Sequence, residues 1–390
     1  MKQRPVKARL VLEDGKVFEG FSFGKAGNSA GEVVFNTAMT GYPESLTDPS
    51  YEGQILVTTF PLQGNYGVPP ASREERTGGG LSDYLESERI HVKGLVVQDY
   101  SWENSHWLSD RSLDAWLRDE GIPGIYGVDT RALTKHLRHC GSMLGKILAE
   151  GVGEDTVEWY DPNLENLVAK ASCPDASLTL ADMRESKDGA PADVTPDKEE
   201  GAPRGEEPHR KKVVLVDCGV KHNIVRCLSR RGVDVLRVPW DYDYTGEDFD
   251  GVFISNGPGN PDMAEKTVEI LRKVMTKGKP ICGICMGNQL LAKAAGARTY
   301  KLPFGHRSHN QPVRRVGSNE CFITSQNHGF AVDDKTLPDE WEPLFVNLND
   351  GTNEGIRHKT MPWFSAQFHP EASSGPKDTE FLFDEFVKLL

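Results

Sequence analysis

Residues 279–296 read KPICGICMGNQLLAKAAG, and this stretch decides the fold of the second half of the chain. The apolar run Lys279–Ile284 is typical of a buried strand, and Asn288–Ala295, which Gly296 ends, predicts a helix. Between them lies GICMG (283–287). A G-x-nucleophile-x-G pattern at a strand-to-helix turn indicates a nucleophile elbow, because glycines permit the strained turn that exposes the middle side chain. A buried structural cysteine beside helix-packing glycines is the alternative, and the pentapeptide alone leaves both open.

The sequence before this stretch repeats the alternation of strand and helix. Strands are expected at Val213–Val216, Val233–Val238 and Gly251–Ile254, and a helix at Asn223–Arg231. Continuous apolar runs are typical of strands that are buried on both faces. The second half of the chain is therefore predicted to be a doubly wound, mostly parallel α/β sheet.

The first half has a different pattern. Ala8–Glu13 and Lys16–Gly20 flank Asp14-Gly15, which is a strong signal for a β-hairpin. Amphipathic helices are expected at Ser112–Glu120 and Thr130–His139. We expect a separate α/β or β-rich domain here.

A polar segment separates the two halves. Residues 186–212 read SKDGAPADVTPDKEEGAPRGEEPHRKK, with no aromatic residue and Val194 as the sole branched aliphatic. Such a segment buries too little apolar surface to offset the entropy lost on ordering. The expected organisation is a first domain at 1–180, a charged flexible linker at 181–212 and a second domain at 213–390.

Composition limits the class of protein. The 390 residues are 26% charged and 37% hydrophobic, with a net charge of -13, which argues against wholesale nucleic-acid binding. No apolar stretch approaches the roughly 20 residues that a bilayer crossing needs. The 7 cysteines are scattered through the chain, which favours reduced thiols and a cytoplasmic location.

A thiol nucleophile needs a base, and the base needs an orienting group. The motif QFHPE (367–371) offers both, because His369 and Glu371 would face the same way if the backbone were extended. Cys285 would lie near a helix N-terminus, which favours the thiolate. The glycines of SNGPG (255–259), which follow a predicted strand, would expose N–H groups to a developing oxyanion. Together these motifs favour catalysis over a structural cysteine.

Two other interpretations are weaker. Cys282 and Cys285 form a C-x-x-C, but neither a second C-x-x-C nor an H-x₃₋₅-H pair follows, so no metal site is expected. In an alternating strand Cys282 would point into the packing while Cys285 is exposed, which disfavours a redox pair. The chain has no phosphate-binding glycine motif, so any ATP in the overall reaction is expected on another polypeptide.

At this point a resemblance emerges. GICMGNQ, QFHPE and SNGPGNP together resemble the glutaminase domain of class I glutamine amidotransferases, over roughly residues 213–390. Residues 31–67, PGIYGVDTRALTKHLR (123–138), VDCGVKHNIVRCL (216–228) and SQNHGFAVD (325–333) are similar to the small subunit of carbamoyl-phosphate synthetases.

The resemblance implies a glutamine-hydrolysing small subunit of carbamoyl-phosphate synthase, with Cys285 as nucleophile, His369 as base and Glu371 as its orienting group. The oxyanion hole would be the N–H groups of Gly259 and Met286. The family's glutamine-binding positions fall on Ser50, Gly257, Gly259, Met286, Gln289, Asn327, Gly329 and Phe330.

The resemblance also implies a partner. A large synthetase subunit would form a heterodimer with this chain, bind bicarbonate, Mg and two ATP, and receive ammonia through a tunnel. The N-terminal domain would dock that subunit, and the product would serve arginine or pyrimidine biosynthesis. No cofactor, nucleic acid or membrane is expected on this chain.

The chain departs from the family's usual pattern in a few places. Met286 and Asn288 stand where leucine and histidine are usual, Ser374 stands where proline is common, and the linker is long. Two alternative functions are open: a docking subunit of an ammonia-dependent synthetase that has lost glutaminase activity, and a free-standing hydrolase of γ-glutamyl compounds. Retention of Cys285, His369, Glu371 and Gln289 disfavours the first alternative, and the docking domain disfavours the second.

Overall fold

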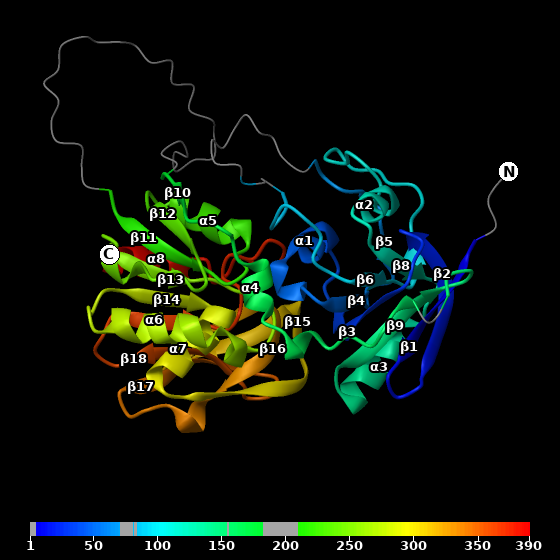
Figure 1. Cartoon of the computed structure of the whole chain (residues 1–390). Helices are drawn as coiled ribbons and strands as arrows, with labels where there is room; N and C mark the ends of the chain where they lie inside the picture. Colours follow the sequence, from blue (N-terminus) through cyan, green and yellow to red (C-terminus); the bar gives the residue numbers. More distant parts are fainter. Residues whose placement is uncertain (1–4, 71–80, 82–83, 154–155, 182–209) are drawn as a thin grey trace, which may run out of the picture.

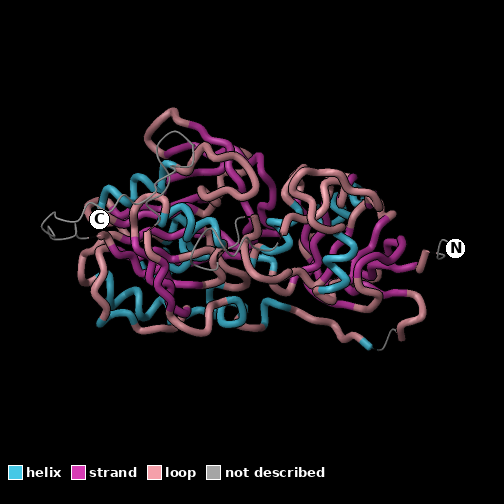
Figure 2. Tube along the Cα trace, turned by 90° about the horizontal axis from the view of Figure 1, so that it is seen from above, coloured by secondary structure: helices cyan, strands magenta, loops and turns pink. Residues whose placement is uncertain are grey.

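The computed structural model describes residues 5–70, 81, 84–153, 156–181 and 210–390. The chain forms two domains that lie side by side, with the N-terminal domain at one end and the C-terminal domain at the other (Figures 1 and 2). Most of the predicted linker lies outside the described residues. The described part of the chain contains no helix with the length and apolarity that a bilayer crossing requires.

The N-terminal domain is built on a closed barrel, in the order β1-β2-β8-β6-β4-β3-β9. Its strands are β1 (Lys7–Leu12), β2 (Val17–Gly24), β3 (Ser29–Asn36), β4 (Gln54–Thr58), β6 (Gly94–Val96), β8 (Pro123–Tyr126) and β9 (Met143–Ala149). The predicted hairpin is present as β1 and β2, which pair antiparallel around Asp14-Gly15. Two short strands, β5 (Leu62–Gln63) and β7 (Asp99–Tyr100), form a separate two-stranded sheet.

Helices pack against both faces of the barrel strands. The helices are α1 (Tyr42–Thr47), α2 (Leu113–Asp119) and α3 (Thr130–Cys140). Successive side chains of β3 point to opposite faces of the strand. Val33 and Phe35 pack in one core with Leu133 and Leu137 of α3, whereas Val34 packs in another core with α1 and α2. The helices predicted at Ser112–Glu120 and Thr130–His139 are thus α2 and α3.

The C-terminal domain has one ten-stranded sheet, in the order β10-β12-β11-β13-β14-β19-β18-β17-β15-β16. Its strands are β10 (Ser177–Thr179), β11 (Lys212–Asp217), β12 (Asp234–Pro239), β13 (Gly251–Ile254), β14 (Ile281–Ile284), β15 (Arg298–Arg315), β16 (Cys321–Asp333), β17 (Trp341–Asn347), β18 (Asn353–His358) and β19 (Trp363–Ala366). Its helices are α4 (Leu167–Ala171), α5 (His222–Ser229), α6 (Glu265–Met275), α7 (Met286–Ala295) and α8 (Phe381–Leu389).

The sheet is parallel in its centre and antiparallel toward both edges. The strands β12, β11, β13, β14 and β19 pair parallel, as expected of a doubly wound fold. The strands β15 to β18 pair antiparallel, and β18 also pairs antiparallel with β19. Short turns join β15 to β16 and β17 to β18, whereas a parallel pair needs a long crossover. The expectation of a mostly parallel sheet therefore describes the central strands.

Helices cover both faces of the central sheet, as the doubly wound pattern requires. Val214 and Val216 of β11 pack in one core with α6 and α7, whereas Val213 and Leu215 pack in another with α5 and α8. All of the β11 residues from Val213 to Asp217 are buried, which explains the continuous apolar run in the sequence.

Residues before the predicted linker also contribute to this domain. β10 pairs antiparallel with β12 and forms one edge of the sheet, and Val168 of α4 packs in the core that α6 and α7 cover. The chain therefore reaches the C-terminal domain before residue 181, and an isolated domain begun at residue 213 would lack this edge strand.

Candidate active site

Cys285 lies at a sharp turn between β14 and α7. Its φ of 54° and ψ of -103° are unusual for a residue with a side chain, and its N–H donates to Ala366 O at 2.8 Å. The flanking glycines make the turn possible. A Cβ at Gly283 would lie 2.5 Å from Gly287 O, and one at Gly287 would lie 2.2 Å from Ile254 O. The helix begins at Met286, two residues before the predicted start, so Cys285 is its N-cap.

The base and its orienting group lie in the segment after β19. His369 Nδ1 donates to Glu371 Oε1 at 2.7 Å, and both side chains are buried. The prediction of an extended backbone here was wrong, because a turn closes between His369 O and Ala372 N at 3.1 Å. His369 Nε2 has no hydrogen-bond partner among the described residues. The nitrogen that would act as the base is therefore free.

Opposite charges hold this pair ionised. Burial would lower the pKa of His369, but the Glu371 carboxylate and the Cys285 sulfur raise it to about 10. Burial would raise the pKa of Glu371, but the charges of Lys221 and His369 lower it to about 2. Lys221 Nζ lies 3.1 Å from Glu371 Oε1 and donates to Ala372 O at 2.5 Å.

A pocket opens at Cys285. Both domains line it: Glu32, Gln54 and Lys301 are among its residues. It also brings together all eight positions that were predicted to bind glutamine, namely Ser50, Gly257, Gly259, Met286, Gln289, Asn327, Gly329 and Phe330. His369 is not among the residues of this pocket, and it lines a smaller neighbouring cavity with Asp48, Lys221 and Asn327.

The backbone of the SNGPG loop requires glycine at positions 257 and 259. A Cβ at Gly257 would lie 2.1 Å from Cys218 O, and Gly259 has a φ of 84°. Met286 is the first residue of α7, so its N–H has no carbonyl four residues back in the helix. Gly259 and Met286, the two predicted oxyanion-hole residues, both line the pocket beside Cys285.

A buried hydrogen-bond network holds Ser50, a residue of the N-terminal domain, at the wall of the pocket. Ser50 belongs to a 3₁₀ turn (Pro49–Tyr51) whose N-cap, Asp48, accepts from Ser50 N at 2.9 Å. Asn256 Nδ2 donates to Ser50 Oγ at 2.9 Å, and Asn327 Nδ2 donates to Asp48 Oδ2 at 2.9 Å. The sequence did not predict the roles of Asp48 and Asn256 in this network, because their contacts join residues more than 200 positions apart.

Asn288, which departs from the family pattern, makes hydrogen bonds with both polar atoms of its side chain. Its Nδ2 donates to Gln367 Oε1 at 2.9 Å, and its Oδ1 accepts from Ser365 Oγ at 2.8 Å. It therefore ties α7 to β19 and to the segment that carries His369. Gln289 Nε2 donates to Phe330 O at 3.0 Å, which holds Gln289 against the pocket wall.

Cys282 takes no part in this arrangement. Both Cys282 and Cys285 are free thiols, and Cys282 is buried in the core beside α5 and α8. Burial raises the pKa of Cys282 well above the ordinary range. The expectation that Cys285 is exposed was wrong, because the turn that carries it is packed in the same buried cluster as Cys282.

The fold and this site define the C-terminal domain as a class I glutamine amidotransferase domain, and residues 214–389 match the family model described as "Glutamine amidotransferase class-I". Residues 10–147 match the model "Carbamoyl-phosphate synthase small chain, CPSase domain". The chain belongs to the carbamoyl-phosphate synthase small-chain family.

Similar proteins are much longer than this chain. The "Multifunctional protein URA2" of Saccharomyces cerevisiae is 50% identical over 396 residues, which cover 98% of this chain and 17% of that protein. The human "Carbamoyl-phosphate synthase [ammonia], mitochondrial" is 47% identical over 385 residues, which cover 98% of this chain and 24% of that protein. This chain thus spans about a fifth of the length of these relatives.

Among solved structures, a glutamine amidotransferase of Thermotoga maritima is 20% identical with a TM-score of 0.36. The match covers 42% of this chain and 77% of that one.

Proposed function

We propose that this chain hydrolyses the side-chain amide of L-glutamine and supplies the ammonia to a synthetase that makes carbamoyl phosphate. The observation that carries the proposal is the Cys285 turn, which opens on a two-domain pocket and lies beside a buried His369–Glu371 pair. A docking surface alone would not need a strained cysteine, a free imidazole nitrogen and an ionised carboxylate together.

The first half of the proposed reaction forms a thioester. His369 Nε2 holds the proton of Cys285, because Glu371 occupies Nδ1 and stabilises the imidazolium. The Sγ thiolate attacks the amide carbon of glutamine, and the N–H groups of Gly259 and Met286 stabilise the oxyanion. The imidazolium then protonates the leaving nitrogen, and ammonia departs.

The second half releases glutamate. His369, now neutral, takes a proton from water, and the resulting hydroxide attacks the thioester carbonyl carbon. The oxyanion uses the same two N–H groups. When it collapses, the carbon–sulfur bond breaks, glutamate leaves, and the thiolate returns to its pairing with the imidazolium.

The pocket offers polar groups for the α-ammonium and α-carboxylate of an amino acid. Gln289 Oε1 and Arg307 Nε are buried without hydrogen-bond partners among the described residues, and both residues line the pocket. A buried polar atom that lacks a partner is costly, so a bound zwitterion would gain by satisfying them. Ser50, Gly257, Asn327, Gly329 and Phe330 complete the proposed glutamine site.

The proposed partner is the large subunit of carbamoyl-phosphate synthetase, with the small chain and the large subunit as a heterodimer. That subunit would bind bicarbonate, Mg and two ATP, and would receive the ammonia in a passage closed to solvent. We propose the N-terminal domain as the docking domain and a cytoplasmic location for the complex. The product would enter arginine or pyrimidine biosynthesis.

The test uses Cys285→Ser in the complete complex. Glutamine-dependent synthesis should fall by roughly ten-thousand-fold, because the nucleophile is lost, while synthesis from added ammonia persists. Cys282→Ser is the matched control, since it changes the neighbouring thiol that packs in the core, and it should retain glutamine-dependent synthesis. Loss of the ammonia-dependent reaction in Cys285→Ser would instead assign Cys285 a structural role.

A second candidate function is that of a docking subunit in an ammonia-dependent synthetase. One observation favours it: a relative 47% identical to this chain carries "[ammonia]" in its name. The two candidates differ in glutamate release from glutamine by the purified chain, alone and with its synthetase. No release in either condition, with ammonia-dependent synthesis intact, would replace the glutaminase proposal by the docking function.

A further inference from the structure

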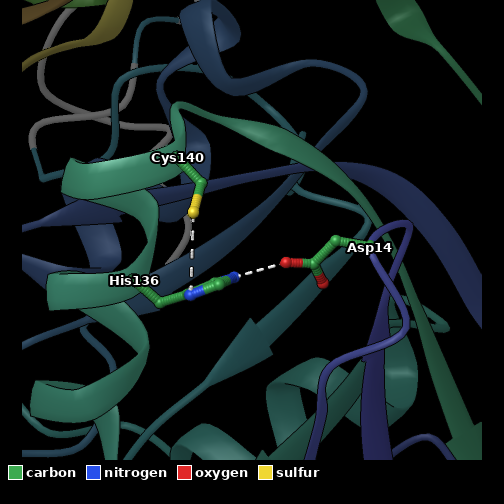
Figure 3. Close-up of side chains that lie close together, drawn as sticks. All are labelled: Asp14, His136 and Cys140. Atoms are coloured by element: carbon green, nitrogen blue, oxygen red, sulfur yellow. Dashed lines mark hydrogen bonds and ion pairs between the residues drawn. The ribbon is translucent and has the colours of Figure 1, made fainter.

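Three side chains with metal-binding atoms meet on the N-terminal domain, away from the pocket. His136 Nε2 lies 2.6 Å from Asp14 Oδ2, and His136 Nδ1 lies 3.9 Å from Cys140 Sγ (Figure 3). One ligand atom from each residue can be chosen so that all three lie within 4.8 Å of one another. A carboxylate, an imidazole and a thiol are the three side-chain types that bind zinc.

The backbone that carries these residues is well fixed. His136 and Cys140 are four residues apart on α3, so they share one face of the helix. Asp14 lies in the turn between β1 and β2, and its Oδ1 accepts from Lys16 N at 3.0 Å, which leaves Oδ2 to face His136. Glu13 pins the same turn to β9, because Glu13 Oε1 accepts from Leu144 N at 2.9 Å.

We propose that Asp14, His136 and Cys140 form a binding site for a divalent transition metal of the zinc class. The ion takes the Cys140 thiolate, one ring nitrogen of His136 and the Asp14 carboxylate, and water completes the tetrahedron. The open fourth position follows from exposure, because Asp14 and Cys140 are both exposed and His136 is only partly buried.

The charges of this ligand set suit the ion. Thiolate and carboxylate together neutralise a divalent cation, and the thiol proton passes to solvent when the metal binds. Lys16 Nζ, which lies 3.4 Å from His136 Nδ1, is the competing cation at the site. Lys16 is exposed, so the bound ion would displace its ammonium into water.

The required movement is small. With metal–ligand bonds of about 2.0–2.3 Å, the ligand atoms of a tetrahedral site lie about 3.3–3.8 Å apart. The ligand atoms lie within 4.8 Å of one another, so each pair has to close by at most about 1.5 Å. If Nε2 of His136 binds the ion, its 2.6 Å contact with Asp14 Oδ2 has to open. The bound metal would join the β1–β2 turn to the C-terminal end of α3.

A second cluster of this kind among the described residues is unsuited to a metal. His306, His328 and Glu354 are buried, and the nitrogens of both imidazoles are already paired. A metal there would have to break those contacts without access to solvent. In the exposed cluster the contacts of His136 with Asp14 and Lys16 must also open, but solvent reaches Asp14 and Lys16 there.

The test is a titration of the full chain with Co²⁺, which gives a near-ultraviolet charge-transfer band when a thiolate binds it. A Cys285→Ser background removes the active-site thiol. We expect a band that saturates at one Co²⁺ per chain, disappears when Cys140→Ser is added, and is displaced by Zn²⁺. Asp14→Asn and His136→Gln should each weaken the apparent affinity at least tenfold.

The matched control is Cys321→Ser in the same background, because Cys321 is also exposed but donates to Asn319 O at 3.7 Å. That variant should keep the band. A band that survives Cys140→Ser, or no band at all, would overturn the proposal. Rapid alkylation of Cys140 without cobalt binding would also overturn it and would make the cluster an activated thiol. Circular dichroism of each variant separates loss of the site from loss of the fold.

Discussion

At the scale of the residue, Cys285 stores strain that the surrounding contacts must hold. A side-chain residue at a φ of 54° costs on the order of 1–3 kcal/mol. The hydrogen bond from Cys285 N to Ala366 O and the absence of a Cβ at positions 283 and 287 keep the turn in place. Gly283 and Gly287 therefore support the conformation of Cys285 because neither has a side chain that would collide with the neighbouring backbone.

Gly287→Ala tests this role. The added Cβ would lie 2.2 Å from Ile254 O, so α7 and β13 must separate, and the free energy of unfolding should fall by about 1–3 kcal/mol. The displaced turn should also slow alkylation of Cys285. Gly246→Ala is the control, because a Cβ at that position would meet no atom within 4 Å. Equal effects of the two substitutions on unfolding and alkylation would contradict this account.

Asp48→Ala tests how Ser50 is placed. Asp48 accepts from Ser50 N and from Asn327 Nδ2, and both residues line the pocket. Its loss should raise the KM for glutamine about tenfold and change kcat much less, because Asp48 holds two residues of the proposed glutamine site. Steady-state glutaminase kinetics measure both constants.

The control for Asp48→Ala is Asp243→Ala. Asp243 caps another 3₁₀ turn, accepts from Thr245 N at 3.1 Å and lies outside the pocket. It should leave the KM unchanged. A fall in kcat alone for Asp48→Ala would count against a binding role.

Sequence motifs could name Cys285, His369 and Glu371 because each lies in a short pattern with its own local geometry. The network around them had no such signal. Lys221 reaches Glu371 across 150 positions, and Asp48 reaches Asn327 across 279. His136 and Cys140 share a helical spacing, but Asp14 lies 122 positions away. Contacts of this range depend on the finished fold.

At the scale of the element, the central strands could be predicted because their apolar runs reflect burial on both faces. β13 spans Gly251–Ile254 as expected, and β11 extends the predicted Val213–Val216 by one residue at each end. Closure of the barrel and the antiparallel edge of the large sheet could not be predicted, because strand order depends on pairing between distant segments rather than on local pattern.

One ionic cluster joins elements of the barrel and predicts a pH dependence. Glu52, just before β4, lies 2.8 Å from His91 Nδ1 and 3.0 Å from Arg89 NH2, in the segment before β6. Burial would raise the pKa of Glu52, but His91, Arg89 and Lys93 lower it to about 2. The folded state therefore binds this proton less readily than the unfolded state does.

Glu52→Gln should cost on the order of 2–3 kcal/mol of stability at neutral pH. Because the folded pKa is depressed, the contribution of Glu52 is present above the ordinary pKa near 4.5 and is lost as the pH falls toward 2. The gap in unfolding free energy between wild type and variant should thus narrow below about pH 4.5. Urea unfolding between pH 7 and pH 3 measures the gap, and a constant gap would contradict the assignment.

At the scale of the whole molecule, a buried ion pair and a partly exposed one join the two domains. Glu86 of the N-terminal domain is fully buried, and its Oε1 lies 2.8 Å from Arg226 NH2 in α5. Lys301 Nζ lies 2.6 Å from Glu32 Oε1 at the edge of the pocket. Removing one member of a buried pair leaves the other charge without compensation.

Glu86→Gln should lower the free energy of unfolding by about 3–5 kcal/mol, because Arg226 and Lys221 both lose a carboxylate. Chemical denaturation of the full chain measures the loss. Glu385→Gln is the control, since the Arg315–Glu385 pair lies within one domain and is partly exposed. Its cost should stay near or below about 1 kcal/mol. Similar losses in the two variants would refute the special role of the interface.

A pocket lined by both domains has a thermodynamic consequence. Any ligand that fills it binds the docked arrangement and not the separated domains, so ligand binding and domain docking must strengthen each other by the same free energy. A saturating amino acid would therefore raise the unfolding temperature of the barrel as well as that of the α/β sheet.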